Sequence, residues 1–203
     1  MKKKVSFLVS GRGSNFTAVA EKIINGQIKA DLGVVISNNK KALALETAQK
    51  MGIAFRAIEH HDYLKREDHE QEVLKVLKEY KTDLVVAAGY LRVLSADFIK
   101  NYQNRIINIH PALLPSFPGL NAQKQAFDYG VKVTGCTSHF IDSGVDTGPI
   151  ILQETVKVES KDTPETLSQK ILAKEHLILS ESVKLFCENR LKVEGRKIFL
   201  LKN

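Results

Sequence analysis

The chain has 203 residues, of which 43% are hydrophobic, and a formal net charge of +7. This length suffices for one domain with a sizeable buried core, and the composition is that of a globular protein. The apolar run after the first lysines is shorter than an export signal, and no stretch approaches the roughly 18 apolar residues that span a membrane. We therefore predict a cytoplasmic protein that does not enter a membrane.

The positive charge favours an anionic partner. The basic residues are dispersed, and their one run, Lys2 to Lys4, has no interleaved aromatic residues, so we do not expect nucleic acid. The positive charge fits a small phosphorylated or carboxylated substrate as well as it fits nucleic acid. Cys136 and Cys187 are expected to be reduced and structural, and no His/Cys spacing is typical of zinc, so we predict no metal.

The first hundred residues alternate between short β-branched runs and longer helical patterns. We predict strands over 5–9, 32–36, 53–58 and 84–88, and helices from the turn at 10–15 to about 25, over 41–50 and over about 64–80. Gly26 is expected to follow the first helix as its C-terminal cap. This alternation predicts a parallel, right-handed sheet with helices on both faces.

The later residues follow a different pattern. We predict a strand over 105–109, a proline-rich loop, an antiparallel strand pair over 131–141 and 150–158, a long helix opened by Pro164, and a terminal hairpin over 192–200. The prediction is one α/β, Rossmann-like domain over residues 1–203. Its mostly parallel sheet is flanked by helices and has an antiparallel C-terminal extension. We expect two halves within it, about 1–104 and 105–203.

A glycine-rich turn, residues 11–15, follows the first strand and opens the first helix. Backbone amides and the helix dipole converge on an anion at such a place, although a plain tight turn remains an alternative. A dinucleotide site is less suitable, because Phe16 replaces the third glycine and residues 37–39 include no acid. The turn therefore suits a single phosphate.

Asn108, His110 and Asp146 form the second candidate site. Asn108 and His110 are two apart at the carboxyl end of a strand, so they should face one space where open α/β sheets bind ligands. Asp146 lies in a glycine-rich loop. Taken singly, the histidine could be a structural hydrogen-bonder and the aspartate a turn former. The combination favours catalysis.

These motifs resemble the folate-dependent formyltransferase family. The similarity rests on Asn108-Ile-His110-Pro-x-Leu-Leu-Pro115, on Gly119 and on Asp146-x-Gly-Pro149, and it runs along nearly the whole chain. The phosphate turn narrows it to the branch that formylates 5-phosphoribosylglycinamide (glycinamide ribonucleotide) in purine biosynthesis. The resemblance implies 10-formyltetrahydrofolate as co-substrate, tetrahydrofolate as product and no metal. The resemblance implies that the first half of the chain binds the phosphate, and that the second half is catalytic and binds the folate.

The resemblance also implies roles for individual residues, by position in this chain. It assigns the ribose phosphate to Gly13, Ser14 and Asn15, catalysis to Asn108, His110 and Asp146, and the glycinamide side to Leu172 and Glu175. It assigns the folate to Arg66, Leu91, Arg92, Val93, Leu94, Asn108, Asp142, Ser143, Gly144, Val145 and Asp146.

Glu175 is unusual even without the resemblance, because its helical neighbours Ile171 and Leu179 are apolar. A ligand amine or an internal partner should meet this carboxylate. The chain departs from some family members at Asn121 and Gln123, where they carry histidines. We therefore expect His110 to be the sole imidazole in the site, with Asp146 as the anion that stabilises its charged form.

Several alternatives stay open. A tRNA-amine formyltransferase or a formylfolate hydrolase would use the same chemistry, but we expect each to carry an extra domain that these residues do not include. A non-catalytic phosphate or nucleic-acid binding module would need none of the three catalytic candidates. The sequence does not distinguish a monomer from a homodimer.

Overall fold

The structure of the protein, a computed structural model, describes residues 1–202. It divides into a first compact unit, Met1–Ile107, and a second that begins at Asn108. Seven strands form one sheet in the order β3-β2-β1-β4-β5-β6-β7, and two more form a separate β8-β9 hairpin. The predicted α/β fold with a mostly parallel sheet and an antiparallel C-terminal part is confirmed.

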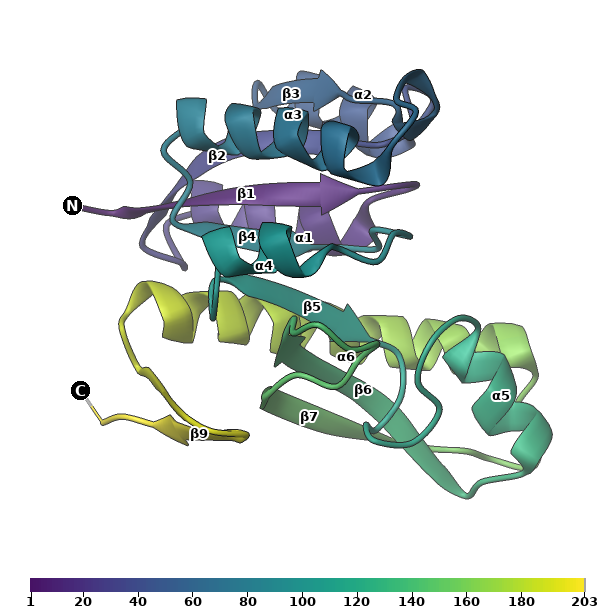
Figure 1. Cartoon of the computed structure of the whole chain (residues 1–203). Helices are drawn as coiled ribbons and strands as arrows, with labels where there is room; N and C mark the ends of the chain where they lie inside the picture. Colours follow the sequence, from purple (N-terminus) through teal and green to yellow (C-terminus); the bar gives the residue numbers. More distant parts are fainter. Residues whose placement is uncertain (203) are drawn as a thin grey trace. The chain divides into compact units, whose positions relative to one another are not determined.

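The first unit alternates strands and helices (Figure 1). Its strands are β1 (Lys3–Val9), β2 (Ala30–Ser37), β3 (Ala54–Ala57) and β4 (Leu84–Ala87), and β5 (Ile106–His110) begins at its end. Its helices are α1 (Ser14–Ile24), α2 (Leu43–Lys50), α3 (Arg66–Glu79) and α4 (Ala96–Asn101), with a 3-10 turn η1 (His60–Asp62).

Strands β1 to β4 are parallel, and helices cover both faces of the sheet that they form. β1 pairs with β2 and with β4, and β2 pairs with β3, all in parallel register. In Figure 1, α1 and α2 lie behind these strands and α3 and α4 lie in front. Both faces of the strands are therefore covered, which is why β4 is a continuous buried apolar run rather than an alternating one.

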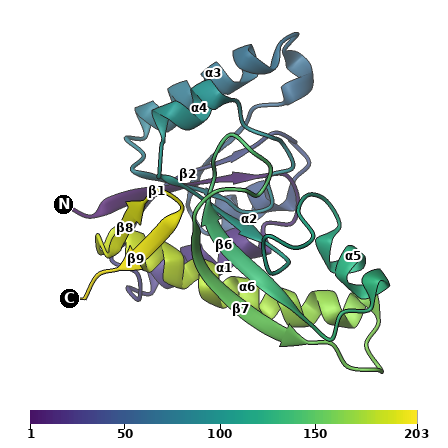
Figure 2. The same ribbon diagram turned by 60° about the horizontal axis from the view of Figure 1, so that its bottom comes forward.

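The second unit is built on an antiparallel pair and one long helix (Figure 2). Its elements after β5 are α5 (Ala122–Tyr129), β6 (Val133–Phe140), β7 (Ile150–Lys157), α6 (Pro164–Cys187), β8 (Leu191–Glu194) and β9 (Lys197–Leu200). β6 and β7 pair antiparallel, and α6 packs on both. α6 starts as predicted at Thr163-Pro164, where the Thr163 side chain and backbone form a reciprocal capping box with Thr166.

Three short helices, η1, α4 and α5, were not predicted from the sequence. α4 has only six residues, too few to show a helical period, and in α5 only Ala122 and Ala126 are buried, so no long apolar stripe indicates it. Their ends are set by particular residues instead. Ser95 caps α4 by accepting a hydrogen bond from the Phe98 amide, and α5 lies between Asn121 and Gly130, which both have positive φ.

Candidate functional site

The Asp146 carboxylate is the centre of a polar cluster in the second unit. Its Oδ2 accepts a hydrogen bond from the Gly119 amide at 2.9 Å and lies 3.2 Å from His110 Nδ1. Its Oδ1 lies 3.4 Å from Asn108 Nδ2 and 3.5 Å from His139 Nε2. The structure thus brings together the three side chains that the sequence singled out, and it adds a fourth.

Asp146 is held in an uncommon backbone conformation, with φ of 54°. Aspartate tolerates this left-handed region better than most residues, at some energetic cost. Burial by itself raises the pKa of Asp146, but hydrogen bonds from His139 and Gly119 and the proximity of His110 outweigh it and lower that pKa below its ordinary value. The carboxylate is therefore ionised at neutral pH.

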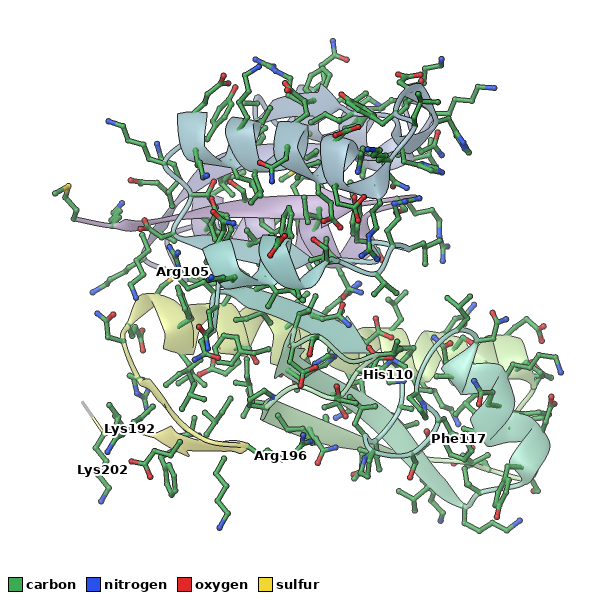
Figure 3. All side chains as sticks on the ribbon, in the orientation of Figure 1. Arg105, His110, Phe117, Lys192, Arg196 and Lys202 are labelled. Carbon is green, nitrogen blue, oxygen red and sulfur yellow. The ribbon has the colours of Figure 1, made fainter. Side chains whose placement is uncertain are left out.

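His110 ends β5 and is buried (Figure 3). Its Nε2 lies 2.8 Å from the Phe117 carbonyl, an acceptor, so this nitrogen carries a hydrogen. Its Nδ1 faces Asp146, so both ring hydrogens of the charged form have acceptors. Burial nevertheless lowers the pKa of His110 below its ordinary value, and Asp146 and Phe117 offset this only in part. The neutral ring predominates at pH 7, contrary to the expectation that Asp146 would hold it charged.

His139, on β6, is a second imidazole in the cluster, and the sequence did not predict it there. Its Nδ1 lies 2.9 Å from the Phe140 carbonyl and therefore carries a hydrogen. In the neutral ring, Nε2 is then an acceptor for Asn108 Nδ2 at 3.2 Å, and in the charged ring it donates toward Asp146. The expectation that His110 is the sole imidazole of the site is wrong. Strand alternation could not reveal this, because it does not show which loop a strand residue meets.

Asn108 contributes an amide to the same cluster. Its Nδ2 is within hydrogen-bond distance of both His139 Nε2 and Asp146 Oδ1. The two amide hydrogens are therefore directed at protein acceptors in this state. Donation to a substrate oxygen requires that one of these bonds be exchanged for the new one.

The loop that carries Asp146 depends on small residues. Asp142 Oδ1 accepts hydrogen bonds from the Gly144 amide at 3.1 Å and from Thr147 Oγ1 at 2.6 Å, which folds residues 142–147 back on themselves. A Cβ on Gly144 would collide with Thr147, and one on Gly148 would collide with the Phe140 carbonyl. Ser143, Gly144 and Val145 are exposed at the tip, so the predicted folate loop presents them to solvent.

The phosphate turn lies in the first unit, between β1 and α1. Gly13 has φ of 75°, and a Cβ there would lie 2.5 Å from the Ala44 Cβ on α2. Only glycine fits both conditions. No side chain caps α1 and no acid lies in its first turn, so the predicted phosphate contacts Ser14 and Asn15 lie at a helix start suited to an anion.

The remaining predicted contacts are placed in two other segments. Residues 91–94 follow β4 in the first unit, with Leu91 and Val93 exposed. Leu172 and Glu175 lie on α6 in the second unit, where Leu172 is half-buried and Glu175 is buried. The carboxylate of Glu175 thus lies within an apolar stripe, as its neighbours predicted.

Comparison with known proteins decides the family. The sequence profile of the formyl transferase family matches residues 3–183. The chain belongs to the formyl transferase family. Among curated members, phosphoribosylglycinamide formyltransferase of Escherichia coli (strain K12) is 35% identical over 193 residues, which cover 95% of this chain and 91% of that protein.

Two further relatives agree. The bovine trifunctional purine biosynthetic protein adenosine-3 is 42% identical over 197 residues, but the chain spans only 20% of its length. The crystal structure of glycinamide ribonucleotide transformylase 1 from Symbiobacterium toebii superposes with a TM-score of 0.97 at 43% identity, and the match covers 99% of this chain and 95% of that one. The family assigned from the motifs is confirmed.

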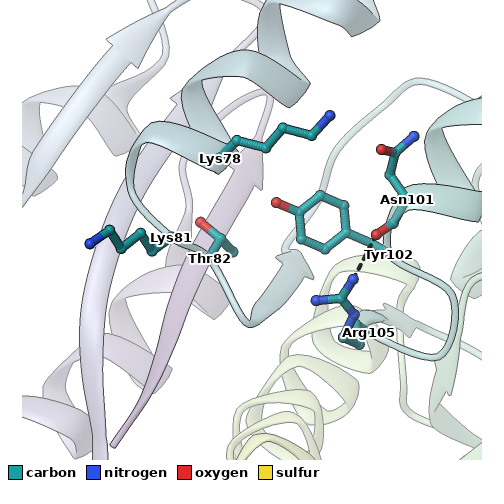
Figure 4. A pocket seen from close by; sticks show the side chains of 6 residues that line it. All are labelled: Lys78, Lys81, Thr82, Asn101, Tyr102 and Arg105. Carbon is teal, nitrogen blue, oxygen red and sulfur yellow. Dashed lines mark hydrogen bonds between the residues drawn. The ribbon is translucent and has the colours of Figure 1, made fainter. Parts of the chain in front are cut away.

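This family member also has a basic pocket of about 250 Å³ in its first unit, whose lining includes none of the predicted site residues (Figure 4). It is lined by Lys78, Lys81, Thr82, Asn101, Tyr102 and Arg105. α3 and α4 both end there, and Arg105 donates to the Asn101 carbonyl at 2.7 Å. Cations near helix C-termini offset the partial negative charge of the last carbonyls. The pocket's charge therefore has a structural explanation.

Within residues 1–202, no helix is long and apolar enough to cross a membrane. Over the same residues, no group of three or more His, Cys, Asp and Glu side chains is arranged to hold a metal ion.

Proposed function

We propose that this chain transfers the formyl group of 10-formyltetrahydrofolate to the amine of 5-phosphoribosylglycinamide, giving N-formylglycinamide ribonucleotide and tetrahydrofolate. The observation that carries the proposal is the contact of one ionised carboxylate, Asp146, with His110, His139 and Asn108. Membership of the formyl transferase family and similarity to enzymes named for this reaction support it.

The reaction forms one C–N bond and breaks another. The substrate amine attacks the formyl carbon, a tetrahedral intermediate with an oxyanion forms, and the bond from carbon to the folate N10 then breaks. The amine loses one proton and N10 gains one, so no oxidant or metal is needed to balance the step. The site must therefore move a proton and stabilise a transient negative charge.

His110 and Asp146 are placed to move that proton. The neutral His110 ring carries one hydrogen for two facing acceptors, the Phe117 carbonyl and Asp146, so the His110–Asp146 pair has room for one more proton. A proton taken from the amine, directly or through a water, is held at Nδ1 with the carboxylate beside it. The same proton can then be delivered to N10. While His110 is protonated, its charge and the Asn108 amide stabilise the oxyanion.

Binding is assigned to the segments that the resemblance indicated. The turn at Gly13, Ser14 and Asn15 would hold the ribose phosphate, and Leu172 with Glu175 would meet the glycinamide portion. Arg66, residues 91–94 and residues 142–146 would hold the folate. We further propose that the protein acts in the cytoplasm, with these small molecules rather than nucleic acid as its partners.

The proposal is tested by mixing the purified protein with the formylfolate and glycinamide ribonucleotide and following both products. We expect one tetrahydrofolate and one formylated ribonucleotide per turnover. Folate release that does not depend on the amine would instead show a formylfolate hydrolase. Absence of both products, with the folded protein verified by its thermal transition, would contradict the proposal.

A further inference from the structure

The segment of residues 91–94 is anchored at both of its ends by side chains. It carries two exposed apolar residues, Leu91 at 71% and Val93 at 55% relative exposure, while Leu94 is buried at 6%. Exposed apolar side chains next to a predicted ligand site are candidates for contact with a flat aromatic group such as a pterin. How well these two side chains can contact such a group depends on how firmly the backbone between them is held.

Ser10, at the end of β1, provides the first anchor. Its hydroxyl accepts a hydrogen bond from the Leu91 amide at 2.9 Å and donates one to Asn38 Oδ1 at 2.6 Å. Its own amide donates to the Gly89 carbonyl at 3.1 Å. The hydroxyl therefore uses both its donor and its acceptor capacity, and Asn38, which orients it, is itself buried.

Glu70, on α3, provides the second anchor. Its carboxylate is 4% exposed and accepts hydrogen bonds from the Ser95 amide at 2.9 Å and from the Ser95 hydroxyl. Its Oε1 also lies 3.9 Å from Arg66 Nε. A buried carboxylate that is hydrogen-bonded twice fixes the residue directly after Leu94, whereas its contact with Arg66 is long and is matched by Glu67 at 3.8 Å.

We propose that Ser10 and Glu70 are positioning residues for the folate side of the site, which hold residues 91–94 as a strap between two fixed points. This inference rests on the proposed function. Neither side chain needs to touch the folate. Each anchor accepts a hydrogen bond from a backbone amide at one end of the strap, and so it limits how far Leu91 and Val93 can move.

The test uses Ser10→Ala and Glu70→Gln, each with a matched control. Ser6→Ala is the control for Ser10, because Ser6 also bonds a backbone amide, that of Val34, and a side chain, Thr82. Glu72→Gln is the control for Glu70, because it lies on the same helix and its Lys75 ion pair is exposed. For both test variants we expect the KM for formylfolate to rise about fivefold or more, with the KM for the ribonucleotide and kcat within about twofold.

Amide hydrogen exchange provides a second measurement that does not depend on activity. We expect the Leu91 amide in Ser10→Ala, and the Ser95 amide in Glu70→Gln, to exchange about tenfold faster than in the parent. Ser6→Ala should lower thermal stability and Glu72→Gln should leave it nearly unchanged, and neither control should change either amide or the folate KM. If both amides exchange at the parent rate, or if the KM values rise equally in controls and test variants, the strap proposal is wrong. An inactive parent with faster exchange in the variants would count against the proposed function alone.

Discussion

At the scale of single residues, the site depends on how one carboxylate is shared. Asp146 accepts contacts from an amide side chain, a backbone amide and two imidazoles, so each partner stabilises its charged form. The pKa of His110 shows the opposite balance. Burial lowers this pKa more than the nearby charge of Asp146 raises it. An ionised acid beside a neutral base is a pair that can accept one proton and return it.

Asp146→Asn removes the charge and keeps the shape of the side chain. We expect kcat to fall by about 100-fold or more, because the proton held at His110 loses its counter-charge, while the KM for formylfolate changes far less. Steady-state kinetics with both substrates varied is the measurement. Asp128→Asn, at an exposed position paired with Lys124, is the control. Near-normal turnover in Asp146→Asn would remove the carboxylate from the mechanism.

His110→Ala should separate binding from chemistry. The ring is buried and its Nε2 contacts the protein rather than solvent, so we expect ligand binding to survive while kcat falls by about two decades or more. Calorimetric titration of the folate gives the affinity, and a stopped assay gives kcat. An unchanged kcat would exclude His110 from catalysis and leave His139 as the candidate base.

The lowered pKa of His110 also makes stability depend on pH. Between that lowered value and the ordinary histidine pKa of about 6.5, the unfolded chain binds a proton that the folded chain does not. Stability therefore rises with pH across this window and is lost as the pH falls. We expect denaturant titrations at about pH 7 and about pH 5.5 to show a smaller loss in His110→Gln than in the parent. His69, whose pKa is also lowered by burial, is present in both proteins and cancels in the comparison.

At the scale of elements, the turns at the carboxyl ends of the strands place the functional groups. The turn after β1 requires glycine at position 13, and the loop before β7 requires it at positions 144 and 148. The anchored segment after β4 is a further example. Each of these connections follows a buried strand, so the rigid sheet fixes where the connection starts and the small residues decide its course.

Gly13→Ala tests the turn after β1. Alanine costs about 1–2 kcal/mol in the left-handed region, and the new Cβ would also meet Ala44 on α2. We expect a loss of unfolding free energy of at least about 1 kcal/mol and a marked rise in the KM for the phosphorylated substrate. Gly26→Ala, which has a similar φ but open space around it, is the matched control for strain alone. Equal losses in the two variants would show that the contact with α2 is unimportant.

At the scale of the whole molecule, the net charge of +7 favours anionic substrates without selecting one. We expect the KM for the phosphorylated substrate to rise several-fold between about 0.05 M and about 0.5 M salt, with kcat nearly constant, because salt screens the attraction. Initial-rate measurements provide the test. A KM that does not depend on salt would show that the field is irrelevant, and tight, salt-sensitive binding to duplex DNA would favour the nucleic-acid alternative.

The order and type of the long elements, the glycine turn after β1 and the three side chains that meet in the second unit were predictable from the sequence, and the resemblance of its motifs indicated the family. Those features depend on local periodicity, on glycine and proline chemistry and on motif spacing, all of which can be read from the order of the residues. The terminal hairpin and the start of α6 were predictable for the same reason.

The remaining features depend on how the elements pack against one another. His139 joins the site because β6 presents it to the loop of Asp146, and Glu70 reaches Ser95 because α3 packs beside α4. The neutral state of His110 follows from burial, which no sequence pattern measures. Contacts between residues far apart in the chain and the desolvation they cause are properties of the packed fold, and so they appear only when the elements are placed together.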